Sequence, residues 1–253
     1  MDLNKNKYKK YKTKYLKLKK HINGCTKINN VLDLVSKNAR FLQKNYPFDV
    51  HKYINKLALN LKCDQWIKIS SDKFNLNKET IKQKKQIYKP MGSWFSKGDW
   101  LFHDQSSIYN VYISLINVNY QNICILTNFD EINEFIEKYG NIETTNYGYN
   151  FIEIDWPSVS KDYQGICIIP NMSKEIIDSW PLTREEKFVK YNWLLGYDTS
   201  SLVLWNFESL LKHKIILYTG DYLLKNDKNP TKIIQGVDKI INKILEESSN
   251  FNK

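Results

Sequence analysis

The chain has 253 residues, of which 42% are hydrophobic and 14% aromatic, including seven Trp and seventeen Tyr. This composition excludes disordered, collagen-like and purely coiled-coil proteins, and the length suffices for one large domain or two small ones. No run approaches eighteen apolar residues, and the lysine-rich N-terminus lacks an apolar segment. We therefore expect neither a transmembrane span nor a secretory signal.

The formal net charge of +11 is concentrated at the N-terminus. Residues 1–30 contain ten Lys and one Asp, whereas the other 223 residues contain 28 basic and 26 acidic side chains. Only two of the 38 basic residues are Arg, the side chain best suited to bidentate phosphate and base contacts. Any electrostatic argument about binding partners therefore concerns the first thirty residues.

Residues 1–24 are predicted to form a basic amphipathic leader helix, with Gly24 at its end. An apolar stripe recurs at helical spacing, formed by Tyr8, Tyr11, Tyr15, Leu18 and Ile22. One interpretation is a helix that binds an acidic surface, which could be phospholipid, nucleic acid or an acidic partner. The other, which the sequence favours, is a stripe that packs on the body or a mostly solvated leader.

Residues 25–253 are predicted to form a single α+β domain, with a helical part over 30–62, an aromatic body over 66–220 and a closing helix over 230–246. Polar cap residues mark the helix starts, namely Asn30, Asp49, Asn128 and Asn229. Runs rich in Ile, Val and Tyr predict strands at 66–70, 109–118, 122–127, 149–155, 165–169, 202–205 and 214–219. Because helices and strands alternate irregularly, we expect a mixed or mainly antiparallel sheet with flanking helices, preceded by the basic helix.

Four cysteines, at positions 25, 63, 124 and 167, lie far apart and show no paired spacing. We therefore expect neither a disulfide framework nor a zinc site, and we expect a soluble intracellular protein from a reducing compartment. The four histidines are isolated, and no acidic run has calcium-binding spacing, so no metal site is predicted. The sequence also lacks a Gly-rich phosphate loop and a G-x-S-x-G nucleophile elbow.

Four segments combine aromatic residues with Ser, Asp and Gly at the ends of predicted elements, namely 89–104, 155–158, 162–166 and 191–206. Rings beside hydroxyls and carboxylates suit a pocket for a planar ligand, because a ring stacks on a base while polar groups orient a ribose. The alternative is that each tryptophan belongs to the core, with its N–H bonded to a nearby polar group. For the set as a whole the sequence favours neither interpretation.

The leader resembles the lysine-tyrosine N-termini of mimivirus-type giant DNA virus proteins, through its run at 8–19 and the Lys/Asn/Ile bias of the chain. Residues 88–206 resemble a group of uncharacterised viral and bacterial proteins. That group shares a Lys-Pro-x-Gly-x-Trp-aromatic-Ser segment, an Asp-Trp before a helix, a Tyr-x-Gly-Ile strand entry and a Trp-x-x-x-aromatic-Asp-x-x-Ser finish. The group is similar to ADP-ribosyltransferase-like domains, which implies a site for NAD.

The resemblance implies roles for individual residues. Trp94 or Tyr197 would stack on nicotinamide, and Ser96, predicted with Asp198 to be catalytic, would contact a ribose. Asp198 would be the catalytic acid, since the last motif holds Asp198 where the family has a glutamate and Glu208 lies beyond it. The predicted cofactor site also includes Gly92, Trp193 and Asp155.

Two functions therefore remain open from sequence. The first is binding of a nucleotide-like ligand, with ADP-ribosyl transfer from NAD as the implied reaction. The alternative is a non-catalytic virion-associated or host-interaction protein, located in the host cytoplasm or the virion and tethered by its basic leader. Nucleic-acid binding through the leader ranks lowest, because the body is nearly neutral.

Overall fold

The computed structural model describes residues 2–30, 32, 46–74, 80–85, 89–102, 108–144, 148–169, 182–197, 199–224 and 227–251. Within these residues the chain is an α+β protein with six helices and three sheets, two antiparallel and one mixed. A basic helix precedes the body, so the predicted fold class is confirmed. Among the described residues, no helix has both the length and the apolar character needed to cross a bilayer.

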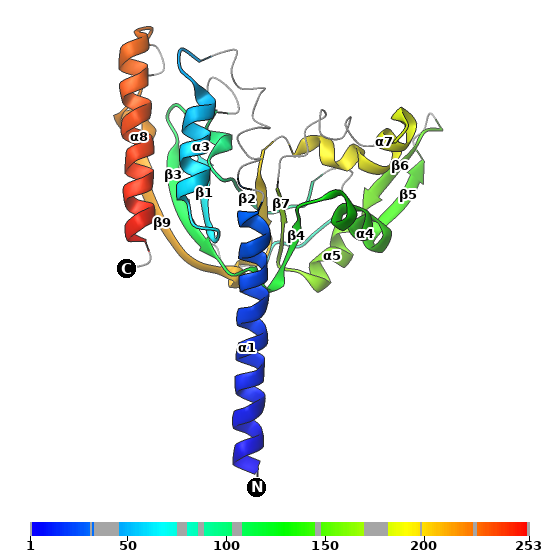
Figure 1. The fold of residues 1–253 in the computed structure, drawn as a ribbon. Coiled ribbons are helices and arrows are strands. Elements are labelled where there is room, and N and C mark those ends of the chain that lie inside the picture. The colour runs from blue at the N-terminus through cyan, green and yellow to red at the C-terminus, as the bar shows by residue number, and fades with distance from the viewer. Residues whose placement is uncertain are drawn as a thin grey trace.

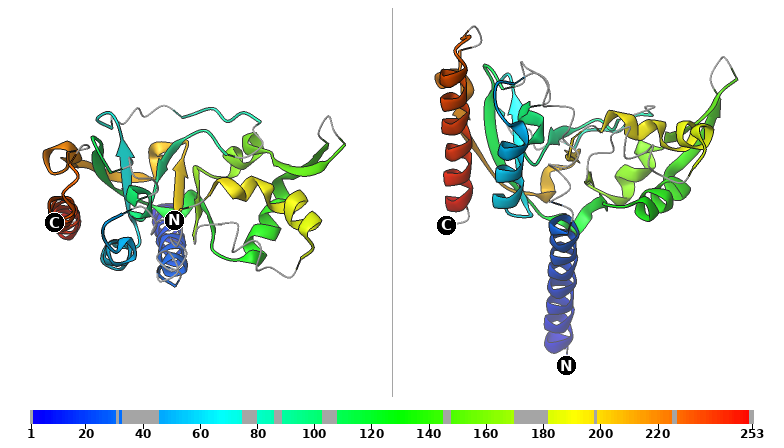
Figure 2. Two further views of the ribbon diagram at one scale, coloured as in Figure 1. Left: turned by 90° about the horizontal axis from the view of Figure 1, so that it is seen from above. Right: turned by 45° about the horizontal axis from the view of Figure 1, so that its top comes forward.

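Helix α1 (Asp2–Asn29) is continuous over 28 residues and projects away from the body, as Figure 1 and the right-hand view of Figure 2 show. The sequence predicts that this helix ends at Gly24, but the helix continues past that residue. Gly24 instead allows a close approach, because a Cβ there would lie only 2.6 Å from Cβ of Tyr120. The last turns of α1 thus pack directly on η3 (Tyr120–Asn122), where Ile28 is fully buried.

The apolar stripe of α1 lies in solvent wherever its side chains are described. Tyr15 is 64% exposed, Leu18 57% and Ile22 52%. The prediction that the stripe packs on the body is therefore wrong for these three residues, and the solvated alternative holds. The physical reason is the length of the helix, since its body contacts are confined to the last turns.

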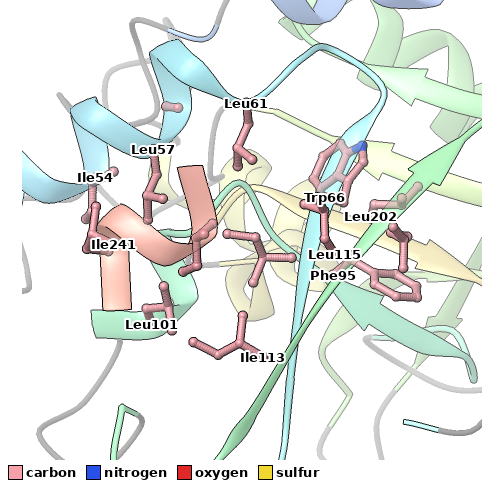
Figure 3. Packing of buried hydrophobic residues seen from close by; sticks show 14 of the residues in the cluster. Ile54, Leu57, Leu61, Trp66, Phe95, Leu101, Ile113, Leu115, Leu202 and Ile241 are labelled. Atoms are coloured by element: carbon pink, nitrogen blue, oxygen red, sulfur yellow. The ribbon is translucent and has the colours of Figure 1, made fainter. Parts of the chain in front are cut away.

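The first sheet is antiparallel and has the order β1 (Gln65–Ser70), β3 (Tyr112–Val118), β9 (Leu210–Tyr218). Helices α3 (Val50–Asn60) and α8 (Pro230–Asn250) lie side by side next to it (Figure 1). Their apolar faces and the sheet share one hydrophobic cluster, in which Ile54 and Leu57 of α3 lie close to Ile241 of α8 (Figure 3). This cluster also contains Trp66, which is fully buried.

The second sheet is mixed and has the order β2 (Ser93–Phe95), β8 (Ser201–Leu204), β7 (Gly165–Ile168), β4 (Ile123–Leu126). Strands β4 and β7 are parallel, and the other neighbours are antiparallel. Reciprocal backbone hydrogen bonds of 2.9 Å between Ile67 and Ser96 connect β1 of the first sheet to the end of β2. The two sheets therefore meet at one point, directly after β2.

The remaining elements lie beyond the second sheet, on the side away from α8 (Figures 1 and 2). They are α4 (Phe129–Tyr139), the hairpin β5 (Gly140–Thr144) and β6 (Asn150–Ile154), α5 (Trp156–Asp162) and α7 (Arg184–Tyr191). A second hydrophobic cluster, rich in aromatic rings, fills the space between these elements and the sheet.

Most local predictions are confirmed. Asp49, Asn128 and Asn229 each accept a backbone N–H of the first turn of their helices. All seven predicted strands are present with shifted ends, whereas β2 and β5 were not predicted. The closing helix runs to Asn250, four residues beyond its predicted end. The predicted helix after Asn30 lies outside the described residues, apart from position 32.

The expectation of unpaired cysteines is wrong, because Cys25 and Cys63 form a disulfide with their Cα atoms 5.1 Å apart. The bond joins the end of α1 to the loop before β1, across a sequence separation of 38 residues. Spacing along the chain does not reveal such a pair, since only the packing of α1 on η3 brings the two residues together. Cys124 and Cys167 are free and buried.

Removing the disulfide should destabilise the protein. A closed loop of 38 residues restricts the unfolded chain, which corresponds to about 4 kcal/mol in the chain-entropy description. We expect the double variant Cys25→Ser, Cys63→Ser to unfold at a lower urea concentration than the oxidised protein. A reductant should lower the wild-type midpoint and leave the double variant unchanged. Equal midpoints for the oxidised protein and the double variant would contradict this expectation.

Candidate functional site

The four aromatic segments come together in the fold. Strand β2 pairs with β8, which places Trp94 opposite Val203. Trp205 Nε1 donates to the Tyr163 carbonyl oxygen at 2.8 Å. The ring centroids of Trp94 and Tyr197 are 5.5 Å apart, and those of Trp156 and Trp205 are 6.5 Å apart. Residues distant in sequence therefore form one aromatic cluster.

This cluster is closed rather than open. Trp193 and Tyr197 have an exposed fraction of 0%, and Trp156 is equally buried. Their neighbours are other rings, including Phe135, whose centroid lies 5.5 Å from that of Trp193. Trp94 is partly exposed, and the Lys89 ammonium lies 5.2 Å from its ring centroid. Trp94 is thus the one described ring among the predicted site residues that solvent reaches.

The predicted polar and glycine residues have structural contacts. The Ser96 hydroxyl is buried and accepts the Gly98 N–H at 3.2 Å. Asp155 caps α5, where its carboxylate accepts both the N–H and the hydroxyl of Ser158. Gly92 lies against β8, since a Cβ there would be 2.7 Å from the carbonyl oxygen of Leu204. Asp198 lies outside the described residues.

Three polar atoms of the aromatic cluster lack a hydrogen-bond partner within the described part of the chain: Trp156 Nε1, Trp193 Nε1 and Tyr197 Oη. Sequence reasoning expects such groups to be satisfied by a nearby polar residue, as Trp205 is. Burial raises the pKa of Tyr197 well above its usual range, so its hydroxyl stays neutral. A buried unpaired donor destabilises the fold by about 1–3 kcal/mol.

Two cavities formed by described residues lie apart from the predicted site, since no predicted site residue lines either of them. The larger, of about 440 Å³, lies between the end of α1, η3, β4 and α4. Its charges are largely compensated, because Lys27 pairs with Glu131 and Lys138 pairs with Asp162. The smaller, of about 380 Å³, lies between the turn at 220–224 and α8. No group of three or more His, Cys, Asp or Glu side chains in the described ranges is arranged to hold a metal ion.

The most unusual polar group in the described structure is Lys97, which is fully buried where the two sheets meet. Its ammonium donates to two carbonyl oxygens of the loop before β1, those of Lys62 (3.1 Å) and Cys63 (2.8 Å), and to that of Gln65 (2.6 Å), the first residue of β1. It also lies 4.4 Å from the ring centroid of Trp66. All three N–H donors of the ammonium are therefore used.

A second buried charge lies two residues further on. The Asp99 carboxylate accepts the backbone N–H of Ser200 at 2.6 Å and the Ser200 hydroxyl at 2.8 Å. That hydroxyl in turn accepts the backbone N–H of Lys97 at 3.0 Å. Burial raises the pKa of Asp99 to about 6, although the hydrogen bonds from Ser200 act in the opposite direction. Burial likewise lowers the pKa of Lys97 to about 7. The network joins β2 to the start of β8.

The Ser96–Lys97 pair does not form a catalytic dyad in this arrangement. A lysine that acts as a general base needs a free lone pair within reach of the nucleophile. The Lys97 nitrogen is instead directed at three carbonyl groups of another segment, and both side chains are closed to solvent. These residues hold the junction of the sheets together.

Sequence reasoning missed the residues with the most distinctive contacts. Lys97 and Asp99 stand inside one of the four segments, yet one lysine of 36 carries no signal of burial. Cys25, Cys63 and His21 were set aside because their spacing forms no motif. Their proximity follows from the packing of α1 on η3, which sequence patterns do not specify. The chain was compared with protein families, curated proteins and solved structures, and none of them matched it.

Replacing Lys97 should lower stability strongly. Lys97→Met keeps the length of the side chain but removes a donor from three buried carbonyl groups. Those of Lys62 and Cys63 keep the Gln65 N–H and the Tyr120 hydroxyl, whereas the Gln65 carbonyl loses its side-chain donor, so we expect a loss of about 1–3 kcal/mol in urea unfolding. Lys52→Met, on the exposed face of α3, should change stability by less than about 0.5 kcal/mol. A Lys97→Met protein as stable as wild type would mean that burying the charge offsets everything its hydrogen bonds contribute.

Asp99 should make stability depend on pH. Because its pKa rises from 3.8 to about 6 on folding, the folded state binds this proton more tightly than the unfolded state. That stabilisation is complete below the unfolded pKa and is lost as the pH rises through the folded pKa. Between pH 4 and pH 7, wild type should therefore lose up to about 3 kcal/mol relative to Asp99→Asn. Parallel stability curves for the two proteins would refute the assignment.

Proposed function

We propose that the chain is a non-catalytic binding protein whose projecting helix α1 docks on an anionic phospholipid surface. This proposal follows the non-catalytic alternative from sequence, a virion-associated or host-interaction protein tethered by a basic leader. The observation that carries it is a long lysine-rich helix with an apolar stripe open to solvent and its base fixed to the body.

Charge and exposure both favour such a contact. Helix α1 contains ten lysines and one acidic residue, Asp2. Where its side chains are described, the lysines at positions 12, 14, 17, 19 and 20 are exposed. A lysine near an anionic membrane contributes about 1 kcal/mol, so several acting together give useful affinity. The body adds little, because it is nearly neutral.

The apolar stripe favours a lipid surface over nucleic acid. Tyr15, Leu18 and Ile22 form an exposed row among the lysines, and such a row can enter the boundary between headgroups and acyl chains. A nucleic-acid helix offers less to an aliphatic stripe, and α1 contains no Arg for bidentate phosphate contacts. A second copy of α1 would be repelled by the like charge.

The nucleotide-binding hypothesis gains no support from the described residues. It requires open ring faces, whereas Trp193 and Tyr197 are buried on all sides. It also requires an acidic side chain beside these rings, and the predicted one, Asp198, lies outside the described residues. NAD binding and ADP-ribosyl transfer therefore stay predictions from the resemblance, with Trp94 as their accessible ring.

Membrane binding can be tested by sedimentation with vesicles. We expect the protein to bind vesicles that contain phosphatidylserine and to ignore neutral phosphatidylcholine vesicles. Replacing Lys12, Lys14, Lys17 and Lys19 by Gln should weaken binding at least about a hundredfold, since each charge contributes about 1 kcal/mol. High salt should have the same effect, because it screens exposed charges.

A matched control removes the same charge elsewhere. Lys52, Lys82, Lys161 and Lys190 are exposed on other parts of the body, and their replacement by Gln should leave vesicle binding nearly unchanged. Leu18→Gln with Ile22→Gln should weaken vesicle binding while preserving charge. The proposal fails if both lysine variants lose binding equally, or if α1 binds duplex DNA more tightly than phosphatidylserine vesicles at the same salt concentration.

A further inference from the structure

The C-terminal end of α1, where the helix joins the body, contains a disulfide beside a histidine. Cys25 and Cys63, which form the bond, are both partly exposed residues. His21 lies one helical turn before Cys25, and its Nε2 atom is 3.9 Å from Cys25 Sγ. This arrangement is independent of the lysines and the apolar stripe of α1.

The protein fixes the orientation and tautomer of this histidine. The backbone N–H of Tyr120 donates to His21 Nδ1 at 3.3 Å, so Nδ1 is the acceptor and the proton of the neutral ring lies on Nε2. The imidazole also stacks on Tyr120, with centroids 5.8 Å apart and planes 16° apart. Its Nε2–H is therefore held toward the sulfur of Cys25.

The contacts at the two cysteines differ in the atom that receives them, which is the main-chain carbonyl oxygen at Cys63 and the sulfur itself at Cys25. The main chain at Cys63 is held by Lys97 and by the Tyr120 hydroxyl, which both donate to its carbonyl oxygen. The sulfur of Cys25, by contrast, faces a ring N–H donor. An N–H donor stabilises a thiolate, and the sulfur that leaves more readily in exchange is the one whose thiolate is better stabilised.

We propose that Cys25–Cys63 is a thiol-exchange site in which an incoming thiolate attacks Cys63 and Cys25 is the leaving sulfur. In the first step a bond forms between the thiolate and Cys63 Sγ, the Cys25–Cys63 bond breaks, and its electron pair stays on Cys25 Sγ. That thiolate accepts a hydrogen bond from the Nε2–H of His21, which keeps its proton. In the second step another thiolate attacks the mixed disulfide and releases Cys63 as a thiolate.

The overall reaction is balanced. Two thiol molecules lose two protons and two electrons and become one disulfide, while the protein disulfide gains them and becomes two thiols. The co-reactant is a low-molecular-weight thiol or a protein dithiol. Reduction removes the covalent link between α1 and the loop before β1, so the site sets how firmly α1 is joined to the body.

The direction of attack can be measured directly. The full-length oxidised protein is treated briefly with glutathione, quenched with acid, alkylated and analysed by peptide mass spectrometry. We expect glutathione on Cys63 and the alkyl group on Cys25, with a preference of at least about tenfold. Cys124 and Cys167 serve as internal controls, because both are buried, and burial raises the pKa of Cys124 to about 12. They should stay unmodified in the folded protein.

The role of His21 is tested by His21→Phe, which keeps an aromatic ring beside Tyr120 and removes the donor. The preference for Cys63 should disappear, and exchange should slow several-fold, whereas His51→Phe on α3 should change neither. A second comparison uses Cys63→Ser, in which alkylation of the Cys25 thiol should shift to higher pH when His21→Phe is added. Glutathione found mainly on Cys25, or a preference that survives His21→Phe, would overturn the proposal. Retained vesicle binding has no bearing on it, since that assay reports on the lysines.

Discussion

The structure depends on how one buried ammonium group is satisfied. Lys97 is the second residue after β2, and its three N–H groups bind the loop before β1 and the first residue of that strand. Beside it, the hydrogen bonds between Ile67 and Ser96 join the two sheets, and Asp99 fixes the start of β8. Burying a charge costs free energy, so this junction is stable only while every donor and acceptor in it is paired. The same loop carries Cys63, and through it the base of α1 is tied to the core.

The closed aromatic cluster shows why ring-rich segments are ambiguous in sequence. Trp, Ser, Asp and Gly at element ends suit a ligand pocket, but they suit tight chain crossings equally well. In this fold Asp155 caps a helix, Gly92 admits the backbone of β8, and Trp193 fills volume between α4 and the sheet. The rings of these segments lie together in the fold. Whether solvent reaches them depends on side-chain packing, which a pattern of residue types does not encode.

What could be predicted from sequence is what short-range physics determines. Asn128 and Gly140 delimit α4 because capping and helix termination involve only neighbouring residues. Strand β2 escaped prediction because three residues carry too little periodicity, and β5 because it begins at the residue that ends α4. The sequence suggested that Gly24 ends a helix. In the structure a glycine is needed there because the helix packs closely on Tyr120, nearly a hundred residues away. The Cys25–Cys63 disulfide and the burial of Lys97 also depend on residues distant in sequence, so neither could be predicted from local patterns.

The projecting helix is best understood together with its base. An isolated lysine-rich helix gains little from intrinsic propensity and loses through repulsion between its charges, so it needs support at one end. Here the support consists of the close contact at Gly24, the stacking of His21 on Tyr120 and the bond from Cys25 to Cys63. Tyr120 makes two of these contacts, with Gly24 and with His21. Its hydroxyl also accepts a hydrogen bond from Trp66 Nε1 and donates one to the Cys63 carbonyl oxygen. The base of the lysine-rich helix α1 is thus anchored to the same loop that Lys97 holds through its ammonium group.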